Sequence, residues 1–293
     1  MCHPSHVEQP APPGMLRIMT LNSWFRSPLP TRAAEIRSWI EATAPHVICL
    51  QEIQRHDDLA QTLADQLASD LPGTWHVVFA GFPARLGGLI GNAILSRWPI
   101  QGSQALRLPG EDALPKSVLH ARTAGIDVCC IHLASAPDGA GIRERQAVMI
   151  DEFARDRAAG NSPLPPILAG DFNATPGASA IRFLRGEQTL HGKSTFYQDA
   201  WAAAGDGTPG HTWTSRNPHT PPAHLFDARC DYIFAGVPHA PLGWSTGHNP
   251  TVPPAGQITS AALLCTYPKT GIMASDHYGL AADICWPDLP PPT

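Results

Sequence analysis

The stretch Pro166-Ile-Leu-Ala-Gly-Asp171-Phe-Asn173-Ala-Thr-Pro176 joins a short apolar run to a polar turn. Its run from Ile167 to Ala169 is long enough for a buried strand, and the Pro-Gly pair at its end indicates a turn. If the backbone stays extended, Asp171 and Asn173 point to the same side, because side chains alternate along a strand. A carboxylate and an amide would then lie side by side at the end of a buried strand. Taken alone, this pattern is more typical of a plain polar loop, so the rest of the chain decides its meaning.

The composition is that of a globular, core-forming chain. Of its 293 residues, 43% are hydrophobic and 15% are charged. The length suits one large domain or two small ones, and no shift in composition marks a boundary. We therefore expect a flexible N-terminal arm over residues 1–14, one domain over 15–286 and a Pro-rich tail over 287–293.

Location and partners are predicted from what the sequence lacks. No apolar run is long enough to span a bilayer, and the N-terminus lacks the apolar centre of a signal peptide. The seven cysteines form no CxxC pair and mostly lie in apolar runs, which indicates buried thiols in a reducing compartment. We expect a cytoplasmic monomer with no obligate protein partner. The net charge of −5 disfavours, without excluding, nucleic acid as the substrate.

Alternating helical and strand-like patterns predict an α/β chain with many strands and few helices. Strands are expected over 16–21, 47–50, 75–80, 89–96, 126–133, 167–169, 231–234, 261–267 and 278–285. Helices are expected from residue 31 to before 45, from a cap at Asp57 to 67, and over 142–157 and 178–184. Residues 205–228 and 238–257 are rich in Gly, Pro and polar residues and are predicted to be long loops.

Polar side chains follow or precede many of these apolar runs. They are Asn22, Glu52, His132, Asp171, Asn173, Asp231, Asp276 and His277. Several carboxylates in one cleft repel unless a cation or protons neutralise them. Hard oxygen ligands without a Cys-His pattern favour Mg²⁺ or Mn²⁺. Such a metal with a spare Asp and a His suits hydrolysis of a phosphate ester.

The same residues lie in motifs that run in order along nearly the whole chain, from about residue 16 to 285. The motifs are Thr-Leu-Asn22, Leu-Gln-Glu52, Gly-Asn92-Ala-Ile-Leu-Ser-Arg97, Ile-His132-Leu, Gly-Asp171-Phe-Asn173, Arg229-Cys-Asp231-Tyr-Ile-Phe and Ser-Asp276-His277. Together they resemble the endonuclease/exonuclease/phosphatase superfamily. The resemblance implies a four-layer α/β/β/α sandwich, in which two mixed β-sheets lie face to face between outer helices.

The resemblance also implies a role for each motif residue. Glu52 would be the main metal ligand, with Asn22 and Asp276 near or on the metal. Asp171 would orient or deprotonate the attacking water, and Asn173 would hold the phosphate or that water.

For the remaining motif residues, the implied roles concern the phosphate. His277 would contact the phosphate and be oriented by Asp231. His132 would be a second phosphate donor or a proton donor.

Three further residues are candidates for substrate binding, and for each of them a structural role is also possible. Asn92 either orients His132 or ties down its own loop. Arg229 is as compatible with a structural salt bridge as with phosphate binding. Trp213 either stacks on a substrate or plugs the edge of the core. The histidines of the first loop, His211, His219 and His224, show no metal-ligand spacing.

The expected function is Mg²⁺-dependent hydrolysis of phosphoester bonds, with a small-molecule or lipid-headgroup phosphoester as the substrate. The first alternative is a metal-dependent nuclease for DNA or RNA. The sequence lacks the basic stripes that tight tracking along a nucleic acid requires. The second alternative is a catalytically inactive binding module, but none of the residues that chemistry would need is missing.

Overall fold

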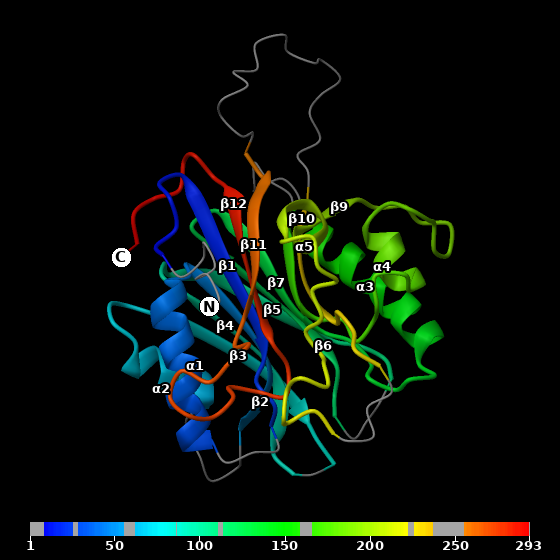
Figure 1. Ribbon diagram of the computed structural model, residues 1–293. Coiled ribbons are helices and arrows are strands. Elements are labelled where there is room, and N and C mark those ends of the chain that lie inside the picture. Colours follow the sequence, from blue (N-terminus) through cyan, green and yellow to red (C-terminus); the bar gives the residue numbers. More distant parts are fainter. Residues whose placement is uncertain are drawn as a thin grey trace.

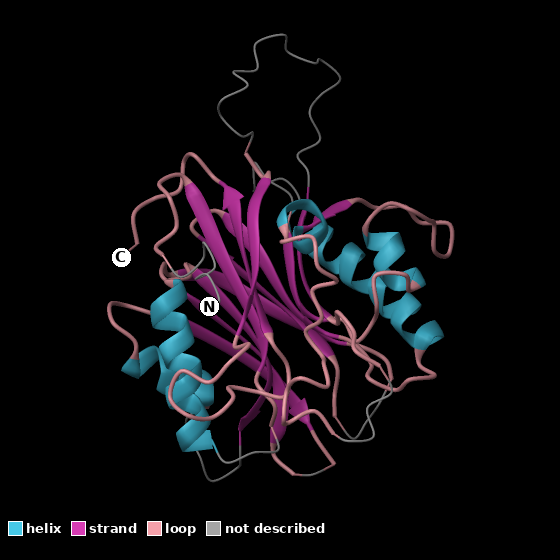
Figure 2. Cartoon of the chain, in the orientation of Figure 1, coloured by secondary structure: helices cyan, strands magenta, loops and turns pink. Residues whose placement is uncertain are grey.

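In a computed structural model of the chain, the residues described are 9–25, 29–55, 62–85, 87–110, 114–158, 166–221, 226–236 and 255–292. Two six-stranded β-sheets lie face to face between outer helices (Figures 1 and 2). The α/β four-layer sandwich expected from the sequence is therefore confirmed.

The first sheet contains both ends of the chain. Its strands are β1 (Met15–Asn22), β2 (Val47–Arg55), β3 (His76–Pro83), β4 (Leu89–Ser96), β11 (Ile258–Leu264) and β12 (Gly279–Cys285). Their spatial order is β11-β12-β1-β2-β4-β3, so the blue and red strands are neighbours in Figure 1. β1 is parallel to β2 and antiparallel to β12, which makes the sheet mixed.

The second sheet is formed by the middle of the chain. Its strands are β5 (Ile100–Arg107), β6 (Ser117–Thr123), β7 (Ile126–His132), β8 (Ile167–Asp171), β9 (Tyr197–Asp199) and β10 (Asp231–Gly236). Their order is β5-β6-β7-β8-β10-β9, with β7 and β8 parallel. The sequence therefore divides in space, because its two ends form one sheet and its middle forms the other.

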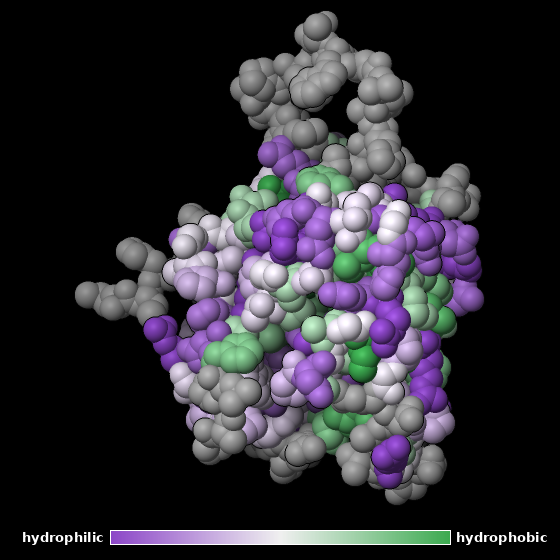
Figure 3. All heavy atoms as spheres, turned by 90° about the vertical axis from the view of Figure 1, so that its right-hand side faces the viewer, coloured by the Kyte–Doolittle hydropathy of each residue, from purple (hydrophilic) through white to green (hydrophobic). Residues whose placement is uncertain are grey.

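The structure describes five helices, of which the first four cover the outer faces of the two sheets and the fifth packs against the core between them. They are α1 (Leu29–Thr43), α2 (Leu63–Asp70), α3 (Ala140–Ala158), α4 (Ser179–Leu184) and α5 (Ala200–Ala204). α1 and α2 pack on the first sheet, on the left of Figure 1, while α3 and α4 pack on the second. On the outer surface of this second side, hydrophobic residues are scattered among hydrophilic ones (Figure 3).

Each sheet is buried on both faces, which explains the continuous apolar runs of its central strands. In β8, Ile167 and Ala169 point into the core between the sheets, and Leu168 points to the outer core beneath α3 and α4. β1 alternates in the same way, with Ile18 between the sheets and Met19 against the first helical layer. β8, which ends in Asp171, thus lies at the centre of the second sheet.

Gly170 fixes how closely β8 can approach β7. Its φ is +153°, and a Cβ atom at this position would lie 2.0 Å from the backbone oxygen of Ile131. Gly170 and Ile131 are paired across the two strands. Only glycine fits this contact, and the residue that follows it is Asp171.

Four short or polar elements were not predicted from the sequence. β5 is an edge strand with a run of exposed residues from 101 to 104, so it lacks an apolar pattern. β6 is buried but carries His120 and Arg122, both of which contact Asp127 of β7 at 2.8 Å. β9 and α5 are too short to show any periodicity. Tertiary contacts, rather than local patterns, form these elements.

The predicted start of the second helix is not supported. α2 begins at Leu63, and Thr62 caps it in a reciprocal capping box with Asp65. The expected cap, Asp57, lies outside the described residues, as do 238–254 of the second predicted loop and His224 of the first. The strand expected over 261–267 begins earlier, at Ile258, and ends at Leu264.

The two ends of the chain contact the domain where the structure describes them. Residues 1–8 of the expected arm lie outside the description, but the backbone oxygen of Gln9 accepts a hydrogen bond from Arg17. In the Pro-rich tail, Leu289 packs against the core between the sheets, and Pro291 accepts a hydrogen bond from the indole of Trp98 at 3.0 Å. The described parts of the arm and tail are therefore held by the domain.

Two expectations from composition concern the cysteines and the membrane. The six cysteines within the described residues carry thiols rather than disulfides, and five of them are buried. None of the described helices combines the length and the apolar composition that crossing a membrane would require.

We predict that Gly170→Ala lowers the stability of the fold by about 1–3 kcal/mol or more, because the added methyl group overpacks against Ile131. The measurement is the free energy of unfolding in urea. The control is Gly141→Ala in α3, where a Cβ atom meets nothing within 4 Å, and it should be neutral or slightly stabilising. Equal stability of the Gly170 variant and the wild type would contradict the prediction.

Candidate active site

Strand register brings three of the predicted residues into one row on the second sheet. Asp171 at the end of β8 is paired with His132 of β7 on one side and with Asp231 of β10 on the other. The first sheet contributes Asn22 from the end of β1 and Glu52 from β2. Residues far apart in the sequence therefore meet at one edge of the sandwich.

A hydrogen bond between the two sheets holds Asp171. The Nδ2 atom of Asn22 donates to its Oδ2 atom at 3.0 Å, and Asp171 is only 1% exposed. Burial and the charge of Asp231 raise the pKa of Asp171 to about 6. Asp171 thus has the pKa of a usable general base near neutral pH.

Asn173 reaches Asp171 by a turn rather than by extended backbone. Its φ is +48°, so the strand ends at Asp171 and the expectation of an extended stretch was wrong. The backbone N–H of Asn173 donates to Oδ1 of Asp171 at 2.8 Å, and its Nδ2 donates to Oδ2 at 3.1 Å. The amide and the carboxylate still meet, because an Asx-type turn folds one onto the other.

Glu52 is aimed into the site by an irregularity in β2. Its φ is +59°, unusual for a residue other than glycine, and the pairing of β2 with β4 shifts register between Leu50 and Ile53. Oε2 of Glu52 accepts a hydrogen bond from the backbone N–H of Phe25 at 3.2 Å. Such bulges are common next to active sites, where they redirect a side chain.

His277 and Asp231 form a buried pair. Nδ1 of His277 lies 2.9 Å from Oδ2 of Asp231. Burial by itself would lower the pKa of His277, but the charge and hydrogen bond of Asp231, with the charges of Asp171 and Asp276, raise it to about 10. The imidazole is therefore protonated at neutral pH, and Asp231 fixes its orientation. The ring of Trp213 packs on it at 4.9 Å between centroids.

His132 has a cationic neighbour that the sequence analysis did not single out. Nζ of the buried Lys116 lies 2.8 Å from Nε2 of His132. Burial, then the charges of Lys116 and His277, hold the pKa of His132 well below its usual value. An ammonium group only donates, so Nε2 of His132 accepts this bond. His132 lines the cavity described below, whereas Lys116 does not, so Lys116 contributes its charge to the site through His132.

The carboxylates Glu52 and Asp276 form the set best suited to a divalent cation. Burial raises the pKa of Asp276 to about 6, with a smaller contribution in the same direction from the charge of Glu52, while the charge of His277 opposes the shift. The amide oxygen of Asn22 is a third hard ligand nearby, although it accepts a hydrogen bond from the N–H of Trp24 at 3.1 Å. All three atoms suit Mg²⁺ or Mn²⁺.

Ligand atoms of Asp171, Asp231 and His277 also lie within 4.8 Å of one another. We consider this cluster a poor metal site. The proton on His277 already compensates the two carboxylates, and a protonated imidazole cannot coordinate a cation.

These residues face a common cavity of about 670 Å³. Asn22, Glu52, His132, Asp171, Asn173, Asp276 and His277 line its polar part. Pro137, Ala178, Pro221 and the exposed Phe226 line the remainder, with Arg143 as the one arginine among the lining residues. The cavity therefore combines a polar floor with an apolar wall, as sites for small molecules commonly do.

The three candidates for substrate binding lie in different places. Trp213 lines the catalytic cavity. Asn92 is fully buried between the sheets, where its Nδ2 donates to backbone oxygens of Ser117 and Cys130 at 3.0 and 3.1 Å, and it does not line the cavity. Arg229 is 5% exposed and forms an ion pair with Asp199 at 2.6 Å, which supports its structural interpretation.

The long first loop builds the wall of the site. Asn217 donates to the backbone oxygen of Ser275 at 2.9 Å, and Thr220 donates to that of Asp276 at 3.5 Å. Thr212 accepts from the backbone N–H of Asp231 at 3.1 Å. The loop thereby ties together the segments that carry three site residues, a role that its composition alone could not reveal.

Comparison with known proteins finds one family model, curated relatives and solved structures that the chain resembles. A model of the Endonuclease/Exonuclease/phosphatase family matches residues 19–277. A curated relative, the uncharacterized protein YbhP of Escherichia coli (strain K12), is 26% identical over 158 residues, which is 47% of this chain and 58% of that protein. The chain thus spans little more than half the length of this relative.

Solved structures show the same fold at low sequence identity. Truncated TDP2 of Caenorhabditis elegans has a TM-score of 0.66 at 18% identity, over 92% of this chain and 98% of that one. TDP2 of D. rerio, complexed with a single-strand DNA product, has a TM-score of 0.67 at 19% identity over the same shares. An endonuclease/exonuclease/phosphatase from Beutenbergia cavernae has a TM-score of 0.60 at 22% identity, over 94% and 72%.

We predict that Mg²⁺ raises the melting temperature more at about pH 8 than at about pH 5, because protonated carboxylates do not bind it. The raised pKa values of Asp171 and Asp276, both about 6, mean that their stabilising contribution is present below about pH 4 and is lost as pH rises through 6. The contribution of His277 is likewise lost as pH rises toward 10. The metal-free protein is therefore weakened at high pH, where Mg²⁺ binds best.

The measurement is differential scanning fluorimetry with and without Mg²⁺. At about 100 times the dissociation constant, Mg²⁺ stabilises by about 2.7 kcal/mol, which corresponds to about 5 °C. Glu52→Gln should reduce the shift, whereas Glu152→Gln on the exposed side of α3 should not. A shift of the same size at both pH values would contradict the assignment of the acidic ligands.

Proposed function

The chain belongs to the Endonuclease/Exonuclease/phosphatase family, and on that premise we propose that it hydrolyses phosphodiester bonds with the help of Mg²⁺ or Mn²⁺. One observation carries the proposal. A buried carboxylate, Asp171, lies in the same cavity as a protonated imidazole, His277, and a separate pair of acids, Glu52 and Asp276. A base, a cationic donor and a set of hard ligands are the parts that hydrolysis of a phosphoester needs.

Asp171 is proposed as the base that receives a proton from the attacking water. Its three hydrogen bonds, one from Asn22 and two from Asn173, fix the carboxylate in one orientation. The water oxygen forms a bond to phosphorus as the bond to the leaving oxygen breaks. Asn173 also donates to the backbone oxygen of Leu133 at 3.0 Å, so its amide is held in place. Positioned groups of this kind lower the barrier without reorganising during the reaction.

His277 is proposed to stabilise the phosphoryl oxygens directly, with Lys116 adding positive charge from behind His132. Both are buried, so their charges act in a medium where solvent screens little. Asp231 occupies Nδ1 of His277 and leaves Nε2 as the donor that remains. The proton that the leaving oxygen requires would come from Nε2 of His277.

A divalent cation would be held by Glu52 and Asp276, with Asn22 beside them. It would supply positive charge to the phosphoryl group, as metal ions do in related chemistry. Ser275 supports this set, because its hydroxyl donates to the backbone oxygen of Asn22 at 2.6 Å and lies 3.2 Å from Oδ1 of Asp276.

The first substrate candidate is a small or lipid-headgroup phosphodiester. A cavity of about 670 Å³ suits one phosphoester with a modest group attached. Its apolar wall offers Trp213, Pro221 and Phe226 to an apolar or ring-bearing group. The net charge of −5 also argues against a surface that tracks a long nucleic acid.

The second candidate is the end of a single DNA strand. The D. rerio TDP2 structure with its single-strand DNA product shares the fold over 92% of this chain. A strand end needs only its terminal phosphodiester in the cavity. This candidate therefore does not require a long basic surface.

A substrate panel separates the two candidates. Small phosphodiesters, phospholipids, phosphomonoesters, plasmid and single-stranded oligonucleotides would be assayed with Mg²⁺ and with chelator. We expect faster turnover of small esters and little salt dependence. Efficient oligonucleotide cleavage that falls steeply with salt would favour the second candidate. No hydrolysis of any ester would favour an inactive binding module.

Asp171→Asn should lower the rate by about 10²–10⁴-fold, because the proton acceptor is lost while the shape is kept. Its melting temperature should change little, since the raised pKa means that the folded protein already tolerates a neutral group there. Asp138→Asn, an exposed change on the loop before α3, is the matched control. A rate within a few fold of wild type would make Asp171 structural only.

His277→Ala and Asp231→Asn should be strongly non-additive, because Asp231 acts by holding the imidazole. The double variant should be about as slow as His277→Ala alone. The measurement is kcat/KM for the two single variants and the double variant. A double variant whose loss equals the product of the single losses would show that the pair acts independently.

A further inference from the structure

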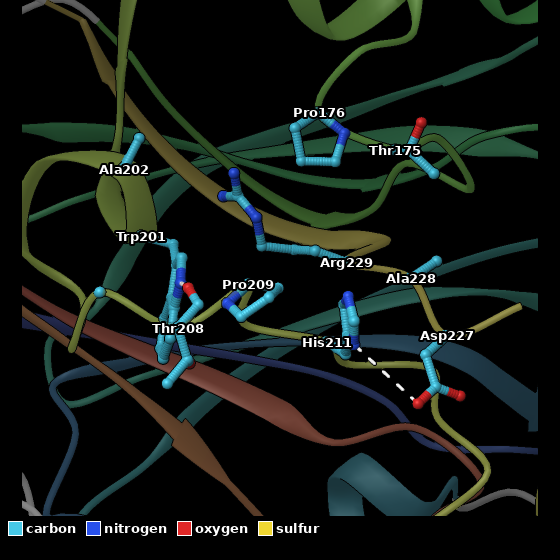
Figure 4. A pocket seen from close by; sticks show the side chains of 11 residues that line it. Thr175, Pro176, Trp201, Ala202, Thr208, Pro209, His211, Asp227, Ala228 and Arg229 are labelled. Atoms are coloured by element: carbon cyan, nitrogen blue, oxygen red, sulfur yellow. Dashed lines mark hydrogen bonds and ion pairs between the residues drawn. The ribbon is translucent and has the colours of Figure 1, made fainter.

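Figure 4 shows the residues that line a second cavity, of about 490 Å³. Its walls come from the turn after Asn173, from α5 and from segments 207–211 and 227–229. Thr175 and Ala228 line both cavities. A substrate whose phosphoester lies in the first cavity therefore has a second cavity directly beside it.

The walls of the second cavity are fixed before any ligand binds. The indole of Trp201 donates to the backbone oxygen of Thr208 at 2.8 Å. A Cβ atom at Gly210 would lie 2.4 Å from that indole, so the loop packs tightly on the ring. Arg229 is held by its ion pair with Asp199 at 2.6 Å. Preformed walls reduce the entropy that a ligand must lose to bind.

The charges of the second cavity do not suit another phosphate. The charge of Arg229 is matched by Asp199. His211 lies with its Nδ1 atom 4.0 Å from Oδ2 of Asp227, so a carboxylate faces it in either protonation state (Figure 4). No cation among the residues that line this cavity lacks a carboxylate partner. An anion would therefore gain little there.

The same side chains suit an uncharged ring that carries hydrogen-bond donors. The side chains of His211 and Asp227 are 37% and 30% exposed, so both can meet a ligand. Each carboxylate oxygen of Asp227 already accepts one hydrogen bond, from the hydroxyl of Thr214 at 2.9 Å or the N–H of Ser215 at 2.7 Å, and each has a second lone pair. A carboxylate accepts hydrogen bonds from hydroxyl or amino groups. Pro176 and Pro209 add apolar surface on which a ring can lie. A cavity of about 490 Å³ is large enough for one ring of this kind.

We infer that the second cavity binds the non-reacting group of the substrate, an uncharged ring bearing hydroxyl or amino groups, such as a nucleoside or a cyclic polyol. The inference rests on the proposed phosphodiesterase function. It makes His211 and Asp227 determinants of specificity rather than of catalysis. It also assigns a function to the loop between α5 and β10 beyond its support of the catalytic residues.

The test fills the second cavity and leaves the first unchanged. Ala202 lies exposed on α5 and lines the second cavity, so Ala202→Phe would occupy it. Ala203 is also exposed on this short helix but does not line the cavity, so Ala203→Phe is the matched control. His211→Ala removes a polar contact without adding bulk.

The substrates would be 4-nitrophenyl phosphodiesters whose second ester group is methyl, a nucleoside or an inositol. Wild type should prefer the ring-bearing esters, and Ala202→Phe should lower kcat/KM for them by about tenfold or more. It should leave the methyl ester within about twofold, because that ester does not reach the second cavity. His211→Ala should lower the preference by a smaller factor, and Ala203→Phe should not change it. Comparison of the two ring-bearing esters identifies the preferred ring.

A direct binding measurement separates this inference from the proposed function. Saturation-transfer NMR with free thymidine or inositol reports occupancy of the second cavity even if no ester is hydrolysed. Signals in wild type that disappear in Ala202→Phe would support the cavity assignment. Equal behaviour of Ala202→Phe and Ala203→Phe in both assays, or an equal loss for all three esters, would overturn it. Failure of wild type to hydrolyse the methyl ester would count against the proposed function alone.

Discussion

The hydrogen bond from Asn22 to Asp171 is the contact on which the site depends, because it joins the two sheets at the point where their strands end. Asn22 belongs to the first sheet and Asp171 to the second. Neither side chain is solvated, so a relative shift of the sheets would leave a buried polar group without its partner. Such a loss costs about 1–3 kcal/mol. The same hydrogen bond therefore fixes both the alignment of the two sheets and the position of Asp171 in the site.

Compensation of charge organises the rest of the site. Asp171, Asp231 and Asp276 are buried close to one another, which is unfavourable unless positive charge is present. His277 supplies part of it, since its pKa of about 10 keeps it protonated. Lys116 supplies more on the side of His132. Glu52 and Asp276 place two carboxylates on the same cavity, and a divalent cation fits best beside this pair.

The described part of the loop between α5 and β10 shapes the surroundings of the catalytic residues. Its residues Asn217, Thr220 and Thr212 form hydrogen bonds with the backbone of Ser275, Asp276 and Asp231. Its outer part then forms the second cavity between Trp201 and His211. In such an arrangement the strands carry the residues proposed for catalysis. The loop contacts the non-reacting group of the substrate, and binding residues are often found on loops that a rigid scaffold positions.

The sequence by itself determined the sandwich fold and which strand ends carry polar groups. Apolar runs such as Ile167 to Ala169 need burial on both faces, and the motifs around Glu52, Asp171 and His277 are local in the chain. It did not reveal β5, β6 or Lys116, because a polar strand or a buried lysine is stable only through partners contributed by distant segments. For the same reason, tertiary structure alone decided that Asn92 ties the sheets together, that Arg229 pairs with Asp199 and that Asn173 reaches Asp171 through a left-handed turn. Local sequence sets which side chains are available at each strand end, whereas register, bulges and cross-sheet hydrogen bonds set which of them meet.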